Sequence, residues 1–251
     1  MTSLGVIGTG QFALYFITAL RKGGYAGQIT VSPRNAAIAA RLAREHCCQI
    51  ALSNQDVLDR SEVVLLSVRP KDLANAVSGL GWRPGHTALS AVAGISLEQH
   101  RRLLPGIGAV HLIMPASYIA TVPGPVPLYP PSEKMAAFLA HAGQVVPLDT
   151  EEGFVSALFA VCFSTWIYDL GDAVSDVFAH MGLSPAQARA ITLGNIAGAA
   201  GYAQSRPDTP LSTLSSEIAT EGTYTKRGLD HMKARAFDAP WREALALISK
   251  T

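Results

Sequence analysis

Residues 8–13, near the amino terminus, read Gly-Thr-Gly-Gln-Phe-Ala. This hexapeptide matches the G-x-G-x-x-G/A pattern that binds the pyrophosphate of a dinucleotide. Gly8 permits a tight turn, Gly10 lets the backbone approach the phosphates, and Ala13 allows a helix to pack closely on a strand. Gln11 and Phe12 would begin that helix, whose amino terminus faces the anion. The hexapeptide predicts a dinucleotide site, with a chance glycine-rich turn as the alternative.

The surroundings of the hexapeptide favour the dinucleotide interpretation. An apolar run at 4–7 predicts a strand directly before it, and an amphipathic pattern at 12–22 predicts a helix directly after it. The mechanism of pyrophosphate binding requires this order of strand, turn and helix within a βαβ unit.

The end of the second predicted strand indicates which dinucleotide binds. Sites for NAD usually place an Asp or Glu there to bind the ribose 2′-hydroxyl. This chain has Ser32, Arg34 and Asn35 instead, and no acid. A guanidinium binds phosphate in a two-pronged geometry, and the hydroxyl and amide add donors. We therefore predict NADP as the cofactor; the alternative is that Arg34 is an ordinary solvated loop residue.

Short apolar runs that alternate with amphipathic stretches predict an α/β Rossmann domain over residues 1–150. The expected strands are 4–7, 29–32, 63–68, 88–92, 110–113 and 144–148, and the expected helices include 12–22 and 36–45. Most of these runs are continuously apolar, which is typical of a parallel sheet buried on both faces. The proline-rich stretch 122–131 is predicted as an extended loop or an edge strand.

Residues 151–251 predict a smaller, all-α domain. Its expected helices are 154–180, 185–205, 211–220 and 225–249, the last with a break around Pro240. The apolar run from Phe154 to Tyr168 is shorter than the roughly 20 residues of a membrane span, so we expect a buried helix and no membrane association. The predicted fold class is an N-terminal Rossmann NAD(P)-binding domain followed by an all-α C-terminal dimerisation domain.

The composition narrows the class of protein. Charged residues make up 16% and hydrophobic residues 49%, which predicts much buried surface, some of it between subunits. A net charge of +1 provides no field for nucleic acid. Three cysteines fit a reduced cytoplasm, with Cys162 in the core, and no spacing of Cys and His predicts a metal site.

Further motifs follow the predicted strands. An apolar run ends in Val-Arg-Pro at 68–70, Asn54 precedes it, and 90–96 read Ser-Ala-Val-Ala-Gly-Ile-Ser. With the hexapeptide, these segments resemble the pyrroline-5-carboxylate reductases, which reduce a cyclic imine to proline with NAD(P)H. The resemblance covers nearly the whole chain. It implies cofactor contacts from Asn54, Val68, Arg69, Pro70, Ala93, Gly94, Met114 and Pro115.

The substrate motifs of that family are only partly present. Its Met-Pro-Asn-Thr-Pro segment is Met-Pro-Ala-Ser-Tyr at 114–118, without the asparagine. Its Ser-Pro-Gly-Gly-Thr-Thr loop, which holds the substrate carboxylate, is Thr-Glu-Gly-Thr-Tyr-Thr at 220–225. Glu221 replaces a proline and Tyr224 a smaller residue, so the pocket gains bulk and an acid. A carboxylate there would oppose an anionic substrate.

Hydride transfer needs a group that delivers a proton to the substrate. The resemblance implies that Thr225 hydrogen-bonds the imine nitrogen; capping of the last helix is its alternative role. Tyr168 and Asp172 lie four residues apart on one helix face, where imine reductases of the wider superfamily present a Tyr or Asp, although they could be only a polar stripe. Tyr224 is a further candidate. Two histidines are weaker candidates, His111 and His231.

Taken together, the residues predict an NADP-dependent reductase of a C=N bond in pyrroline-5-carboxylate or a related cyclic imine. The apolar helical domain predicts a homodimer built through 154–205, with a small-molecule substrate. A reductase of a ketone or deazaflavin, and a non-catalytic NADP-binding protein, are the alternatives. Residues 154–180 contain no lysine, which counts against the hydroxyacid dehydrogenases of similar architecture.

Overall fold

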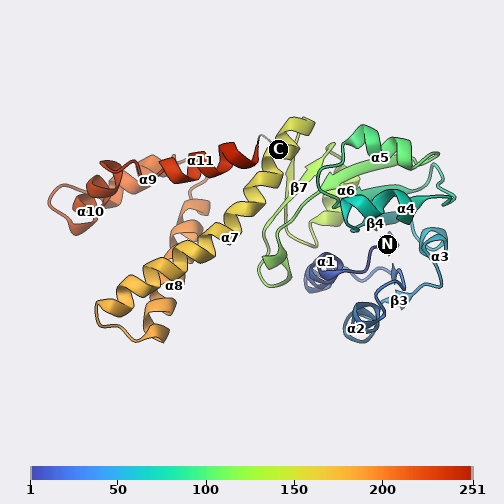
Figure 1. Ribbon diagram of the computed structural model, residues 1–251, viewed down its shortest axis with the longest axis horizontal. Helices are drawn as coiled ribbons and strands as arrows, with labels where there is room; N and C mark the ends of the chain where they lie inside the picture. Colours follow the sequence, from blue (N-terminus) through green and yellow to red (C-terminus); the bar gives the residue numbers. More distant parts are fainter. Residues whose placement is uncertain (1, 250–251) are drawn as a thin grey trace. The chain divides into compact units, whose positions relative to one another are not determined.

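The computed structural model describes residues 2–249, which divide into two compact units between Val161 and Cys162 (Figure 1). The first unit contains all the strands of the sheet with their covering helices, and the second is helical. The predicted class, a Rossmann domain followed by a smaller helical domain, is confirmed. The boundary predicted near residue 150 stays a prediction, since α7 (Glu151–His180) continues from one unit into the other.

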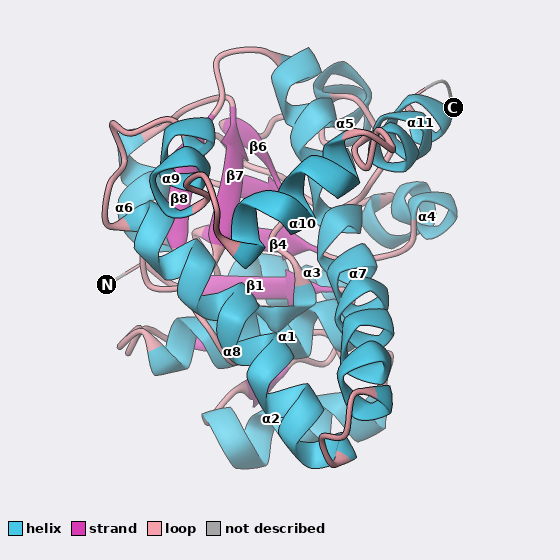
Figure 2. Cartoon of the chain, turned by 90° about the vertical axis from the view of Figure 1, so that its left-hand side faces the viewer, coloured by secondary structure: helices cyan, strands magenta, loops and turns pink. Residues whose placement is uncertain are grey.

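One mixed sheet organises the first unit (Figure 2). Its strands are β1 (Leu4–Ile7), β2 (Ile29–Val31), β3 (Gln49–Ile50), β4 (Val63–Leu66), β5 (Thr87–Ser90), β6 (Ala109–Ile113), β7 (Pro125–Tyr129) and β8 (Gln144–Pro147). Their order is β3-β2-β1-β4-β5-β6-β7-β8, and the first six are parallel. Because those six strands share a direction, the loops that follow β1, β2, β4, β5 and β6 meet at one edge of the sheet. An open α/β sheet binds its ligands at this edge.

Helices cover both faces of the sheet. They are α1 (Gln11–Lys22), α2 (Ala36–His46), α3 (Asn54–Asp59), α4 (Leu73–Val77), α5 (Leu97–Leu103) and α6 (Glu133–Leu139), with 3₁₀ turns η1 (Pro70–Asp72) and η2 (Ser117–Ala120). One core cluster takes side chains from α1, α2 and α6, and the other takes them from α3, α4 and α5. Consecutive residues of one strand divide between the clusters: Leu65 faces the first and Leu66 the second. Burial on both faces therefore explains the continuous apolar runs.

The proline-rich stretch forms β7, which is neither a loop nor an edge strand. It lies between β6 and β8, runs antiparallel to β6, and so corrects both the predicted position and the all-parallel sheet. The carbonyls of Gly124 and Leu128 accept hydrogen bonds from the amides of Gln144, in β8, and Leu148, directly after it, which places the nitrogens of Pro125 and Pro127 on the opposite side. On that side β6 pairs only with Leu128 and Tyr129, so these prolines remove no ladder hydrogen bond.

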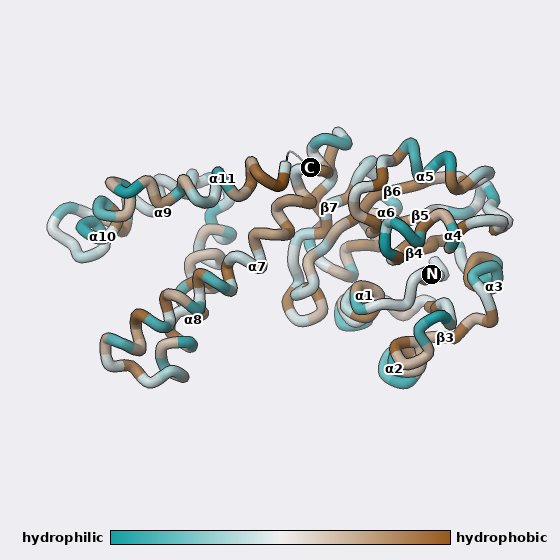
Figure 3. Tube along the Cα trace, viewed as in Figure 1, coloured by the Kyte–Doolittle hydropathy of each residue, from teal (hydrophilic) through white to brown (hydrophobic). Residues whose placement is uncertain are grey.

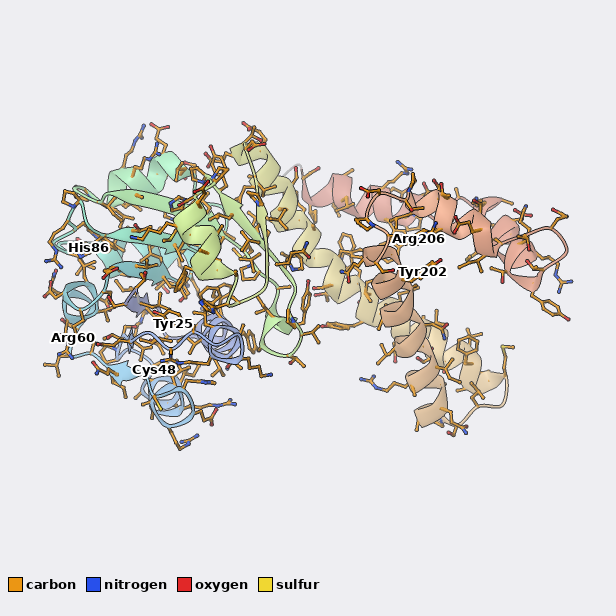
Figure 4. All side chains as sticks on the ribbon, turned by 180° about the vertical axis from the view of Figure 1, so that it is seen from behind. Tyr25, Cys48, Arg60, His86, Tyr202 and Arg206 are labelled. Carbon is orange, nitrogen blue, oxygen red and sulfur yellow. The ribbon has the colours of Figure 1, made fainter. Side chains whose placement is uncertain are left out.

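The second unit consists of α7 and four further helices. These are α8 (Pro185–Gln204), α9 (Leu211–Ile218), α10 (Tyr224–Lys233) and α11 (Ala239–Ile248). Trp241 of α11 packs on Phe163 and Trp166 of α7, with ring centroids 5.6 and 6.0 Å apart. Arg206, just after α8, binds Tyr202 and Glu217, and so links α8 to α9 (Figure 4). The predicted break at Pro240 is present, because Pro240 lies in the first turn of α11.

The expectation that α7 is a buried helix is wrong for the single chain. Its first turns bury Phe154 in the core of the first unit, but Phe163 and Val177 are about half exposed, at 48% and 58%. Cys162, expected in the core, is exposed. Figure 3 shows how apolar this helix is along much of its length. By length and composition it could cross a membrane, but one such helix is weak evidence because core helices of soluble proteins pass the same test.

Three buried histidines make stability depend on pH. Burial lowers the pKa of His86, His100 and His111 below the ordinary 6.5, so each stays neutral in the folded chain after its unfolded counterpart gains a proton. The free energy of unfolding therefore falls as pH drops below 6.5, by at most about 1.4 kcal/mol per pH unit for each histidine. Urea unfolding at about pH 7.5 and about pH 5.5 measures this loss. His111→Gln should make the dependence shallower, and equal stability at the two pH values would contradict the account.

Candidate functional site

The turn between β1 and α1 holds the glycine motif in a fixed shape. Gly8 has a φ of +102°, which only glycine adopts readily, and a Cβ there would lie 2.6 Å from the backbone of Ser67. The Gly8 amide donates to the Ser32 hydroxyl at 3.2 Å, and its carbonyl accepts from the Ser67 hydroxyl at 2.8 Å. Gly10 is the N-cap of α1 and has no neighbour within 4 Å of a Cβ position, so its surface is open. This is the geometry that a pyrophosphate requires.

The three polar residues predicted after β2 have different surroundings. The Ser32 hydroxyl is buried and meets the Thr9 hydroxyl at 2.9 Å, so it holds the turn. Asn35 is the N-cap of α2 and accepts from the Ile38 amide. The Arg34 side chain is 70% exposed and lies 3.9 Å from an Asp72 oxygen. Arg34 is thus an exposed and only loosely paired cation that an incoming phosphate can meet.

Two cavities that share lining residues lie along this edge of the sheet. One, of about 270 Å³, is lined by residues that include Asn54 and Ala76, and the other, of about 480 Å³, by residues that include Gly10 and Arg69. The two cavities are lined by half of the residues predicted for the cofactor: Gly8, Gly10, Ser32, Arg34, Asn35, Asn54, Val68 and Arg69. The Asn54 amide donates to the Ala76 carbonyl at 2.9 Å, which ties α3 to α4 beside the first cavity.

Several predicted cofactor residues do not line these cavities. Ala93 and Gly94 are exposed in the loop after β5, and Met114 and Pro115 follow β6. Four others lie outside the cavity linings. Gln11 is exposed at the start of α1, and Phe12 stacks on Phe16. Ala13 is fully buried, and Pro70 begins η1.

The sequence analysis missed Asp72, which lines both cavities. Its carboxylate faces Arg34 from η1, although 38 positions separate the two residues in the chain. The only available signal was its place two residues after Pro70, in a segment already predicted to contact the cofactor.

The four main catalytic candidates, Tyr168, Asp172, Tyr224 and Thr225, belong to the second unit. Tyr168 and Asp172 line a groove of about 820 Å³ along α7 and α8, together with Asp169, Asp176 and Arg189. Tyr224 is 86% exposed, and the Arg227 guanidinium lies over its ring at 5.5 Å. Tyr224 and Thr225 begin α10 and do not line that groove. The structure therefore separates the four candidates into two pairs.

The cap of α10 is Thr223 rather than Thr225, which corrects one of the two roles considered for Thr225. The Thr223 hydroxyl accepts from the Lys226 amide at 3.1 Å and donates to the Thr220 carbonyl at 2.7 Å. Thr225 is exposed in the first turn of the helix. Its hydroxyl is therefore not used to cap the helix.

The two candidate histidines differ in accessibility. His111 is buried in β6, and its Nδ1 lies 2.8 Å from the Pro130 carbonyl oxygen. His231 is exposed on α10, beside Arg235. Within residues 2–249, no group of three or more His, Cys, Asp or Glu side chains could hold a metal ion.

Comparison with known proteins separates the chain into two matched parts. Residues 3–94 match the family described as NADP oxidoreductase coenzyme F420-dependent, and residues 155–250 match pyrroline-5-carboxylate reductase dimerisation. The pyrroline-5-carboxylate reductase of Pseudomonas aeruginosa is 28% identical over 98% of this chain and 94% of its own length. That of Haemophilus influenzae is also 28% identical, over 99% of this chain and 96% of its own. The chain is thus similar to pyrroline-5-carboxylate reductases along nearly its whole length.

Solved structures agree in fold. The pyrroline-5-carboxylate reductase from Coxiella burnetii has a TM-score of 0.85 at 17% identity and covers 98% of this chain and 95% of its own. A reductive aminase from Aspergillus terreus has a TM-score of 0.59 at 19% identity over 89% of this chain and 79% of its own. The helical unit matches the model of a dimerisation domain, which supports a homo-oligomer.

The two motif glycines should respond differently to an added methyl group. Gly10→Ala should fold normally, because its Cβ meets nothing, but should weaken dinucleotide binding at least about tenfold by blocking the pyrophosphate. Gly8→Ala should lose both binding and stability, because its Cβ meets the Ser67 backbone at a positive φ. Thermal melting and fluorescence titration with NADPH measure the two properties. Equal loss of stability in both variants would contradict this assignment.

Proposed function

We propose that this protein is an NADPH-dependent reductase of a C=N bond, acting on pyrroline-5-carboxylate or a related cyclic imine. The observation that carries the proposal is the open Gly8–Gly10 turn beside Arg34, in a chain related to pyrroline-5-carboxylate reductases along nearly its full length. The family member from Plasmodium falciparum, which has the same fold, is described with NADP bound. When bound, the cofactor supplies a hydride, and the protein must bind, orient, exclude water and deliver a proton.

The residues of the first unit suit the phosphates of NADP. The first turn of α1 has no side-chain cap, so its backbone N–H groups are available to the pyrophosphate. Arg34 would receive the 2′-phosphate, since its guanidinium is exposed and only loosely paired with Asp72 at 3.9 Å. The capping amide of Asn35 keeps α2 in place beside it.

The second unit would supply the proton and hold the substrate. Thr225 would donate its hydroxyl hydrogen bond to the imine nitrogen, which is supported by the use of Thr223 as the helix cap. As a hydroxyl it polarises or relays rather than acting as a strong acid. Tyr168, Asp172 and Tyr224 are the other candidates for contact with the substrate. The two-domain division near residue 150 and a cytoplasmic location are part of the proposal.

Glu221 and Tyr224 favour a substrate that differs from pyrroline-5-carboxylate in charge or size. Glu221 lies in the turn before α10, where the family holds the substrate carboxylate, and Gly222 next to it has a φ of +81°. An acid at this point repels a carboxylate. The exposed ring of Tyr224 adds bulk that can stack on an apolar or aromatic ring of the substrate.

We also propose that the homo-oligomer is a dimer built through residues 154–205. Large apolar side chains on α7 and α8 are exposed in the single chain: Val155, Phe163, Leu170, Val177, Ile191, Leu193 and Tyr202. A surface of this kind is typical of an obligate interface. The low content of charged residues in the whole chain is consistent with such an interface.

Arg34 should select NADPH over NADH. Arg34→Ala should raise the Kd for NADPH by about 10- to 100-fold, which corresponds to about 1.4 to 2.7 kcal/mol, and should change the Kd for NADH little. Arg44→Ala is the matched control, because Arg44 is an equally exposed arginine on α2, where it pairs with Glu45. Titration of each variant with both dinucleotides makes the comparison. Equal weakening of both would show that Arg34 does not read the 2′-phosphate.

Turnover of pyrroline-5-carboxylate tests the function itself. Mixing the protein with NADPH and this substrate should consume NADPH, and Thr225→Ala should lower kcat about 100-fold because the proton donor is lost. Thr225→Ser should retain most of the activity, and Thr213→Ala, an exposed threonine of α9, serves as the control. Loss of nicotinamide absorbance is the measurement.

The outcome separates the alternatives. If the wild type turns over slowly and Glu221→Gln lowers KM, the substrate carboxylate meets the acid as proposed. NADPH binding without turnover of any imine would contradict the proposal and favour a non-catalytic NADP-binding protein. Turnover of ketones or of a deazaflavin alone would favour a reductase of another acceptor, with which the match of residues 3–94 to a coenzyme F420-dependent family is consistent.

A further inference from the structure

A buried serine and histidine lie behind the loop that follows β5. Ser90 is the last residue of β5 and His100 lies in α5; they are 2% and 0% exposed. The Ser90 Oγ lies 2.6 Å from His100 Nε2. With so little exposure, neither side chain can meet a substrate, so a nucleophilic serine is excluded as their role.

The hydrogen bonds around the imidazole set its tautomer. Nδ1 lies 2.9 Å from the Ser96 carbonyl oxygen, which can only accept, so Nδ1 carries the proton. Nε2 then accepts from the Ser90 hydroxyl, and the Ser90 Oγ in turn accepts from the Val92 amide at 3.3 Å. Burial lowers the pKa of His100, which keeps the ring in the neutral form that this arrangement needs. The ring therefore joins the two ends of the loop between Ser90 and Ser96.

A carboxylate from the start of α7 completes this arrangement. Glu151 Oε1 accepts from the Leu97 amide at 2.8 Å, one residue after Ser96. Ser96 itself forms a reciprocal capping box with Gln99, in which each side chain binds the other residue's amide. Both ends of the loop are thus held by side chains.

The middle of the loop has no such support. Ala93 and Gly94 form an exposed turn, and among the described residues no side chain is hydrogen-bonded to the backbone of residues 93–95. Gly94 has a φ of +73°, so the backbone makes a sharp turn there. The shape of this segment consequently depends on how its two ends are fixed. It lies at the carboxyl edge of the sheet, two strands away from β1, with the Gly8 turn at the same edge.

We propose that Ser90 and His100 are positioning residues, whose hydrogen bonds hold residues 91–95 in the shape that receives the nicotinamide end of the dinucleotide. The inference rests on the proposed function, since it assumes that NADPH is the ligand. The adenine end is bound near Arg34 and Asn54, on the other side of β1 and β4, and does not depend on this serine and histidine. The two ends of the dinucleotide should therefore respond differently when the pair is broken.

The test compares NADPH with 2′-phospho-ADP-ribose, which has the same adenine end but no nicotinamide. His100→Leu and Ser90→Ala should each raise the Kd for NADPH about tenfold, the factor that one lost hydrogen bond of about 1.4 kcal/mol produces. The Kd for 2′-phospho-ADP-ribose should not change. His100→Gln, which can still accept from Ser90, should recover part of the NADPH affinity.

His86→Leu is the matched control. His86 is a second buried imidazole, at the opposite end of β5, bonded to the Arg83 amide (Figure 4). His86→Leu should lower the free energy of unfolding without changing the ratio of the Kd for NADPH to the Kd for 2′-phospho-ADP-ribose. An unchanged ratio in His100→Leu, or an equal loss of both ligands, would overturn the positioning role while leaving the proposed function intact. A wild type that binds 2′-phospho-ADP-ribose and not NADPH would instead overturn the proposed function, and this inference with it.

Discussion

The two hydrogen bonds to the backbone of Gly8 are the constraint on which the rest of the first unit depends. The Gly8 N–H donates to a hydroxyl after β2 and the Gly8 carbonyl accepts from a hydroxyl after β4, so the backbone of one residue joins three neighbouring strands. The backbone of Ser67 approaches so closely that no Cβ fits. Both cavities of the site include Gly8 in their lining, and Arg34, Asn54 and Asp72 take their places around it. A small residue at one turn thus sets the distance between the loops that carry the site.

Much of this first unit could be predicted from the sequence because its signals are local. The continuous apolar runs predicted β1, β2 and β4 within one or two residues, and the hexapeptide predicted the turn. The short helices α3, α4 and α5 were missed, since five to seven residues contain too little periodicity. The position of β7 depends on which of its proline nitrogens face a neighbouring strand, and that is a property of the sheet. Asp72 and the Ser90–His100 pair were missed for the same reason: their partners are defined by packing.

For the second unit, the positions of the helices were predicted better than the burial of their side chains. Its helix boundaries were close. The same stretch was expected to be a buried helix and part of a dimer interface, and in the single chain α7 is largely exposed. A residue pattern states which side chains avoid water and does not state which molecule covers them. The candidate catalytic residues share this difficulty, because Thr225 and Tyr224 lie exposed at a helix start and their partners come from another molecule or ligand. The N-cap of α10 is Thr223, which lies only two positions before Thr225, the threonine considered for that role.

The scarcity of buried residues in the helical unit has a consequence for how the chain exists in solution. Among the described residues from 162 onward, the buried ones are Gly171, Ala188, Thr192, Leu214 and Ala219, mostly small. Such a core cannot offset the conformational entropy of so many ordered residues. The missing free energy must come from the association of subunits, and its size therefore depends on the protein concentration. Concentration then acts as a thermodynamic variable alongside temperature: dilution alone would shift these helices toward the unfolded state while the Rossmann unit remained intact.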